Sequence, residues 1–63
     1  MWILNKKQII NLDNVVSLSV NEVGDLVLQA CGNTTITISG VPEDIIHQIW
    51  MANKKKQDIF VIQ

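Results

Sequence analysis

The clearest signal in the chain is a strict alternation of apolar and polar residues over its middle third. Residues 16–20 read Val-Ser-Leu-Ser-Val, and residues 35–39 read Thr-Ile-Thr-Ile-Ser. A two-residue period places alternate side chains on opposite faces of a strand, so both segments predict half-buried β-strands, with Val16, Leu18 and Val20 sharing one face. Residues 26–31 predict a strand between them. The breaks at 21–25 and 32–33 predict tight turns, so these strands form an antiparallel meander.

After residue 42 the pattern changes from the period of a strand to that of a helix. Pro42 suits the first helical position, where its missing N–H costs nothing. Glu43 and Asp44 complement the helix dipole at its amino end. The apolar residues that follow recur at helical spacing: Ile45, Ile46, Ile49, Trp50 and Ala52. This pattern predicts one amphipathic helix near residues 42–54 that packs onto the sheet through this stripe.

Short β-prone runs at both ends of the chain extend the predicted sheet. Residues 2–4 and 8–12 flank a turn at Asn5-Lys6-Lys7, and residues 58–62 form a last apolar run. The predicted fold class is therefore α+β, an antiparallel sheet of five or six short strands with one helix and a C-terminal strand. The length of 63 residues allows a single domain, 1–63.

The terminal strands carry apolar residues on both faces. Such strands are usually buried on both sides or pair with another chain, and one helix covers only one face of a sheet. A second copy of the chain would cover the remainder, so we expect a homo-oligomer, most simply a dimer. The expected interface residues are Trp2, Ile3, Leu4, Ile59, Phe60, Val61 and Ile62.

The composition supports this expectation. Apolar residues make up 48% of the chain, although a domain of this size buries only about 60% of the surface that its unfolded chain exposes. Small domains gain stability from disulfides, a metal or association. Cys31 is the only cysteine and cannot form a disulfide within the chain, and Cys31 with His47 falls short of the four ligands of a structural zinc site. Association remains.

The charged residues exclude several kinds of partner. The net charge is −1 and arginine, which grips phosphate and guanine in a bidentate manner, is absent, so a nucleic-acid partner is not expected. No apolar run reaches the roughly eighteen residues of a membrane span, and a lone cysteine fits a reducing compartment. We therefore expect a cytoplasmic protein without membrane contact. The candidate phosphate contacts are Lys6, Lys7, Lys54, Lys55 and Lys56.

No group of residues has the pattern of a catalytic site. His47 has no serine or cysteine beside it in the pattern of a nucleophile pair. The helix dipole explains the carboxylates of Glu43 and Asp44, and nothing cationic lies near Cys31 in the sequence to activate its thiol. We expect a protein that is not an enzyme and that carries no cofactor or metal.

A ladder of hydroxyl and amide groups is predicted on one face of the meander. Such a ladder is usually the solvated side of an antiparallel sheet. The alternative is a polar surface enclosed between protomers that binds a small polar ligand. The residues of this ladder are Ser17, Ser19, Gln29, Thr35 and Thr37.

The opening of the chain resembles small proteins from phages and mobile elements of low-GC Gram-positive bacteria. The resemblance rests on the segments W-I-L-N at residues 2–5 and I-I-N-L-D-N-V at residues 9–15, and on the layout of a meander with one helix. It implies an accessory protein that binds a host or defence factor. We therefore expect a non-catalytic, homo-oligomeric interaction module.

A second resemblance is to the carbon storage regulator family of RNA-binding translational repressors, which are strand-swapped dimers. The matching residues are Met1, Ile3, Leu4, Lys6, Lys7, Val20, Gly24, Asp25 and Val27. That family has an arginine where this chain has Lys6, and its histidine-arginine-glutamate segment has no counterpart here. This resemblance implies an alternative function, a small nucleic-acid-binding regulator. A second alternative is a small-ligand-binding protein with its site at a subunit interface.

Overall fold

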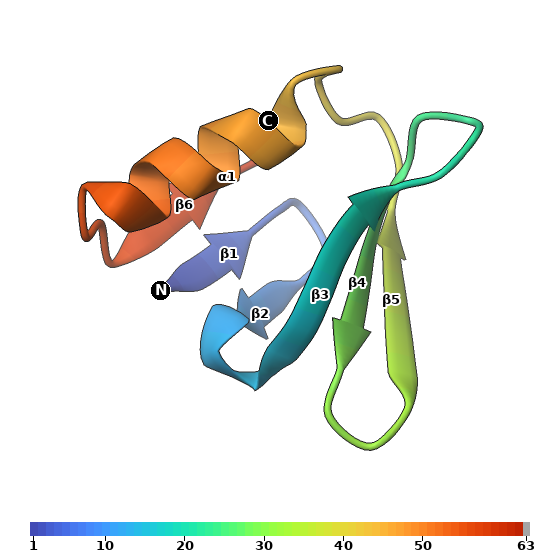
Figure 1. The fold of residues 1–63 in the computed structure, drawn as a ribbon, viewed down its shortest axis with the longest axis horizontal. Coiled ribbons are helices and arrows are strands. Elements are labelled where there is room, and N and C mark those ends of the chain that lie inside the picture. The colour runs from blue at the N-terminus through green and yellow to red at the C-terminus, as the bar shows by residue number, and fades with distance from the viewer. Residues whose placement is uncertain (63) are drawn as a thin grey trace.

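The computed structural model describes residues 1–62 and contains six short strands and one α-helix (Figure 1). The α+β class and the strand number agree with the prediction. The strands, however, form two three-stranded sheets, in the orders β2-β1-β6 and β3-β4-β5, and not one antiparallel sheet. The elements are β1 (Trp2–Leu4), β2 (Ile9–Asn11), the 3-10 helix η1 (Leu12–Asn14), β3 (Val15–Val20), β4 (Leu26–Ala30), β5 (Thr34–Ile38), α1 (Ile45–Lys54) and β6 (Ile59–Val61).

The β3-β4-β5 sheet is the predicted antiparallel meander. Gly24 (φ 87°) supplies the positive φ of the first turn, and Gly32 and Asn33 supply it in the second. The register places Leu18 opposite Leu28 and Leu28 opposite Ile36. This row and its neighbour, Leu26 opposite Ile38, face the core, so the alternation in the sequence reports correctly which face of these strands is buried.

A β-bulge at Val16 changes the face assignment at the start of β3. Val15 lies opposite Ala30 and Ser17 lies opposite Gln29, so Val16 is an extra residue with no partner of its own. Its side chain is 72% exposed, whereas Val15 packs against the core. The prediction that Val16 shares the buried face of Leu18 is therefore wrong. The bulge shifts the inward position by one residue.

The β2-β1-β6 sheet joins the two ends of the chain. β1 and β2 form an antiparallel hairpin, and β6 lies parallel to β1 on its other side. The amide of Trp2 donates to the carbonyl of Asp58 and the amide of Ile62 donates to that of Leu4, both at 2.8 Å. This parallel pairing differs from the predicted all-antiparallel arrangement. After α1 the chain returns to the edge of β1, where β6 runs in the same direction as β1.

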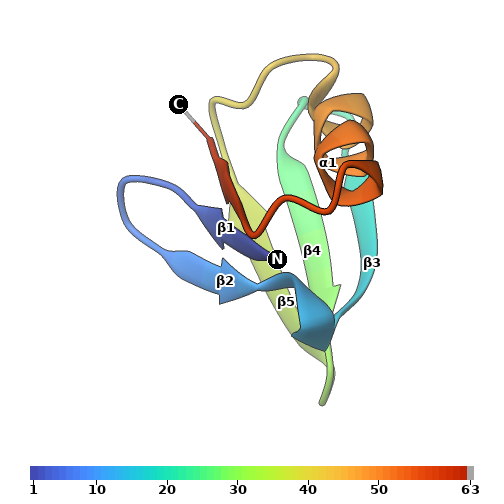
Figure 2. The same ribbon diagram turned by 90° about the vertical axis from the view of Figure 1, so that its left-hand side faces the viewer.

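The core lies between the two sheets and α1. In Figure 2 the sheets face one another and α1 lies along one side, where it contacts β3 and, with β6, borders a small hollow. Each of these three layers contributes apolar side chains that are almost fully buried. They are Ile3, Ile10, Leu26, Leu28, Ile38, Ile45, Ile49 and Ile62.

The helix begins at Ile45, three residues later than predicted. A turn precedes it, in which the amide of Ile45 donates to the carbonyl of Pro42 at 3.1 Å. Asp44 stands at the N-cap without a side-chain cap hydrogen bond, and its Oδ1 accepts instead from Nε2 of Gln48 at 2.7 Å. The buried face consists of Ile45, Ile49 and Ala52, at spacings of four and three residues.

Trp50 is not part of this buried face. Its side chain is 55% exposed, and Ile46 is exposed beside it. The helix enters the core by one narrow ridge, so the neighbouring stripe of Ile46 and Trp50 stays outside. The predicted stripe was therefore too wide.

Candidate interaction surface

The outer face of the β2-β1-β6 sheet is almost entirely apolar. The register forms two outward rows across the strands, Ile9–Leu4–Val61 and Asn11–Trp2–Ile59, with the inward row Ile10–Ile3–Phe60 between them. Five of these six outward positions are therefore apolar. We call this surface the terminal-sheet face, and it consists of Trp2, Leu4, Ile9, Ile59 and Val61.

Four of these side chains are about half exposed or more. The exposed fractions are 47% for Trp2, 69% for Ile9, 54% for Ile59 and 56% for Val61. Given the ordinary sizes of these side chains, the exposed apolar surface is on the order of 400 Å². A patch of that size on so small a domain is typical of an interaction site.

The structure divides the seven predicted interface residues between two faces. The terminal-sheet face includes Trp2, Leu4, Ile59 and Val61, and for these four residues the interface stays a prediction. The other three point inward. Ile3 and Ile62 are almost fully buried, so the chain's own core covers them, and Phe60 is partly buried against that core. The second sheet supplies the cover that the single predicted sheet lacked.

Ile9 was missed as a surface residue. Ile9 and Ile10 are adjacent apolar residues in one strand, so one of them must point away from the core. The exposed one extends the terminal-sheet face onto β2. This doublet was the signal in the sequence that could have found it.

The outer face of the other sheet is polar. The register aligns Ser17 with Gln29 and Gln29 with Thr35, and it aligns Val27 with Ser19 and Thr37. The predicted ladder of hydroxyl and amide groups is thus on one face, interrupted by Val27 and with the exposed Val16 beside Ser17. The two sheets therefore present opposite chemistry outward, polar on β3-β4-β5 and apolar on β2-β1-β6.

The lysines lie in two separate places and not in one patch. Lys6 and Lys7 occupy the β1–β2 turn, beyond Leu4, while Lys54–Lys56 end the helix and lead to Asp58 beside Trp2. These are opposite ends of the same sheet. Nζ of Lys54 is 5.1 Å from the ring centroid of Trp50, a distance typical of a cation–π contact. The structure therefore offers no continuous basic surface for a nucleic acid.

The other candidate residues are exposed and do not converge. Cys31 is free at the β4–β5 turn, and the ring of His47 lies 6.1 Å from that of Trp50. Among residues 1–62 no three His, Cys, Asp or Glu side chains are placed to hold a metal. The only ion pair in that range joins the N-terminal amine and Asp13 at 3.9 Å. No helix among the described residues is long and apolar enough to cross a membrane.

Comparison with known protein families, curated proteins and solved structures finds no match to this chain. The functional interpretation therefore rests on the chain's own residues. Within the described part of the chain, four of the nine exposed large hydrophobic side chains lie on the terminal-sheet face, which therefore carries the argument below.

Proposed function

We propose that this protein is a non-catalytic, homo-oligomeric interaction module, a cytoplasmic accessory protein of a phage or mobile element that binds a host or defence factor. The observation that supports the oligomer is the exposed apolar terminal-sheet face. Residues of this kind are normally placed inside a fold or against another chain.

A second copy of the chain is the partner that fits this face. Of the six outward positions of this sheet only Asn11 is polar, so the terminal-sheet face needs an equally apolar surface opposite it. Two sheets that pack face to face interdigitate their side chains and keep their strands within about 30° of each other. A two-fold axis lying in the plane between the faces would pair the surface with itself.

The areas are consistent with a dimer. Two copies of a patch of about 400 Å² remove roughly 800 Å² of apolar surface, and the surrounding rim brings the total toward the ~1,200 Å² at which specific interfaces begin. A chain of 63 residues has little core of its own, so burial of this face also supports the fold.

A single charge placed on the face tests this arrangement. Ile59→Asp puts a carboxylate on the outward row beside Trp2, and we expect it to convert a dimer into a monomer in light scattering at tens of micromolar. Thr35→Asp is the matched control, because it puts the same charge on the polar face of the other sheet. If Thr35→Asp dissociates the dimer and Ile59→Asp leaves it intact, the interface lies on the β3-β4-β5 sheet and the proposed arrangement is wrong.

The accessory role is supported by the resemblance of residues 2–5 and 9–15 to small phage and mobile-element proteins. In the dimer, the exposed Ile46 and Trp50 of α1 would stay free to contact a host factor. The neighbouring genes test this role directly. Phage or defence genes beside it would support the proposal, and a conserved metabolic operon would contradict it.

A further inference from the structure

β5 is a free edge of the meander, and its outer side carries unpaired backbone groups. It is the last strand in the order β3-β4-β5, so β4 pairs with one side of it and no strand pairs with the other within residues 1–62. In an antiparallel pair, alternate residues point both their N–H and their C=O away from the partner strand. In the same part of the chain, residues 34–39 take part in no turn or loop hydrogen bond. These outward groups are therefore open to another strand.

Among the sheet edges of the described residues, β5 is the one without a feature that hinders strand addition. β2 and β6 are only three residues long. β3 is bulged at Val16 and contacts α1. β5 has five residues, all β-branched and uncharged, and its register with β4 is unbroken. It is therefore the edge that accepts an added strand most readily.

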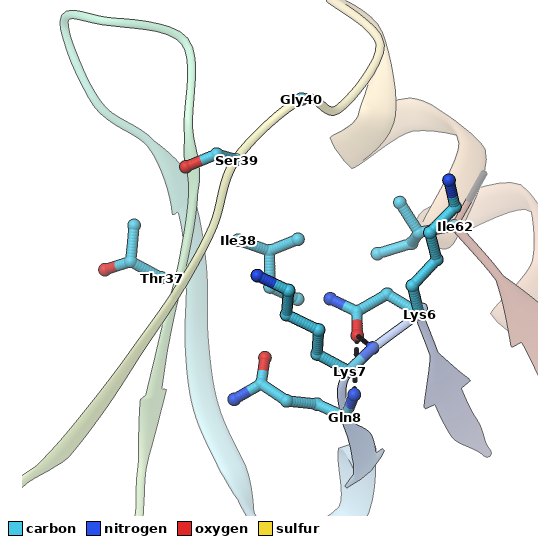
Figure 3. Close-up of a pocket in the computed structure, with 9 residues that line it drawn as sticks. Lys6, Lys7, Gln8, Thr37, Ile38, Ser39, Gly40 and Ile62 are labelled. Atoms are coloured by element: carbon cyan, nitrogen blue, oxygen red, sulfur yellow. Dashed lines mark hydrogen bonds between the residues drawn. The ribbon is translucent and has the colours of Figure 1, made fainter.

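The two faces of the chain along β5 differ in chemistry. Figure 3 shows Thr37 and Ser39 on one side of the backbone and Ile38 on the other, toward the β1–β2 turn. A hollow of about 560 Å³ lies between that turn and residues 37–40, so the turn does not close over this end of the strand. Paired residues of neighbouring strands point to the same face. An added strand must therefore alternate polar and apolar side chains to match both faces of β5.

The charges beside this edge favour an acidic partner. Lys6 and Lys7 are the charged residues that line the hollow, and neither forms an ion pair within residues 1–62. Their ammonium groups attract a segment with carboxylates next to the turn and repel a segment with further ammonium groups there. The attraction depends on net charge alone and requires no defined anion site.

We propose that the free edge of β5 binds an extended segment of another protein as an added strand. The segment alternates apolar and hydroxyl side chains and is flanked by acidic residues. Main-chain hydrogen bonds would supply the affinity, and the alternation and the charge would supply the selectivity. The edge belongs to the β3-β4-β5 sheet and not to the sheet of the terminal-sheet face, so this binding does not depend on the dimer proposed above.

Amide hydrogen exchange with a synthetic peptide tests the proposal. The probe is a capped peptide that alternates isoleucine and threonine and carries a glutamate at each end. We expect it to bind with a dissociation constant of about 1 mM or below and to protect alternate amides of residues 34–38. Absence of binding, or new protection at β2, β3 or β6 instead, would overturn the proposal. Protection of β5 that rises with the concentration of the protein alone would also overturn it, because a second copy would then occupy the edge.

Altered peptides separate strand addition from general adhesion. N-methylation of consecutive peptide residues removes the main-chain donors and should abolish binding. Lysine in place of both glutamates should weaken binding at least about threefold. An N-methylated peptide that binds as tightly as its parent would contradict main-chain pairing, and equal affinity for the acidic and basic peptides would contradict the acidic partner.

Paired lysine variants test where the charge preference arises. Lys6→Gln with Lys7→Gln should remove the preference for the acidic peptide. Lys55→Gln with Lys56→Gln removes the same charge at the other end of the β2-β1-β6 sheet and should leave the preference unchanged. Equal effects of the two pairs would place the segment away from the β1–β2 turn and overturn the proposal. The Ile59→Asp variant should keep full peptide affinity, so a failure of the dimer and a failure of the β5 edge remain distinguishable.

Discussion

Lys56 holds a left-handed backbone conformation at the end of α1. Its φ is 58°, and it follows the C-cap residue Lys55. The amide of Lys56 donates to the carbonyl of Asn53 at 3.0 Å, and that of Gln57 donates to the carbonyl of Ala52 at 3.1 Å. This is the Schellman pattern, in which the left-handed position is usually glycine because a Cβ is strained there.

Replacing this lysine with glycine should stabilise the protein. Lys56→Gly removes the left-handed strain, and we expect the free energy of unfolding to rise by about 0.5–1 kcal/mol in urea denaturation. Lys55→Gly makes the same change one residue earlier, where φ is −80° and there is no strain to relieve. Glycine adds backbone freedom to the unfolded chain, so this variant should lower the free energy of unfolding. Destabilisation by both variants to the same extent would show that the helix ends elsewhere.

Ile49 is the residue of α1 that should contribute most to its packing. Its side chain is almost fully buried at the centre of the helix's inward ridge. Ile49→Ala leaves a cavity between the helix and the sheets, and we expect a loss of about 2–5 kcal/mol in the free energy of unfolding. His47→Ala, two residues away and exposed, should change it by less than about 0.5 kcal/mol. If the helix faced the other way, His47→Ala would lower the melting temperature more than Ile49→Ala does.

At the scale of elements, the sequence predicted the features that neighbouring residues in the chain determine. The meander turns at Gly24 and Gly32 and the end of the helix follow from local residues, and all lie close to their predicted positions. The bulge at Val16 and the exposure of Trp50 were missed because each depends on how elements meet across the core. The division into two sheets was missed for the same reason, since the pairing of β1 with β6 joins residues more than fifty positions apart.

The β6 strand is predicted to be essential to the fold and not only to the interface. It pairs with β1 along its length, and the chain just beyond it places Ile62 in the core. Deletion of residues 58–63 should therefore give unfolded or insoluble protein, visible as a loss of the cooperative thermal transition. A truncated chain that unfolds cooperatively at the temperature of the intact protein would show that the β1–β6 pairing contributes nothing.

At the scale of the whole molecule, the distribution of charge argues against a nucleic-acid partner. The five lysines are offset by six carboxylates and lie at opposite ends of one sheet. At about 150 mM salt we expect any RNA or DNA to bind with an apparent dissociation constant above about 1 µM in fluorescence anisotropy. Nanomolar binding that weakens steeply with added salt would support the regulator alternative instead.

The site was predicted less completely than the fold. The interface was assigned to strands that are apolar on both faces, but the sequence alone does not say which face the chain itself will cover. The second sheet covers Ile3 and leaves Trp2 outside. The hollow between the β1–β2 turn and residues 37–40 was not predicted, because only the folded chain brings these two segments together.

The fluorescence of Trp2 during dilution tests the central claim most directly, because this side chain lies on the proposed dimer face. In a Trp50→Phe variant Trp2 is the only tryptophan. The dimer account predicts a blue-shifted emission at tens of micromolar that moves to the red on dilution, in step with a halving of the mass in light scattering. A Trp2→Phe variant, which reports on Trp50, should show no shift. An unchanged Trp2 emission with a monomer mass throughout the series would contradict the account.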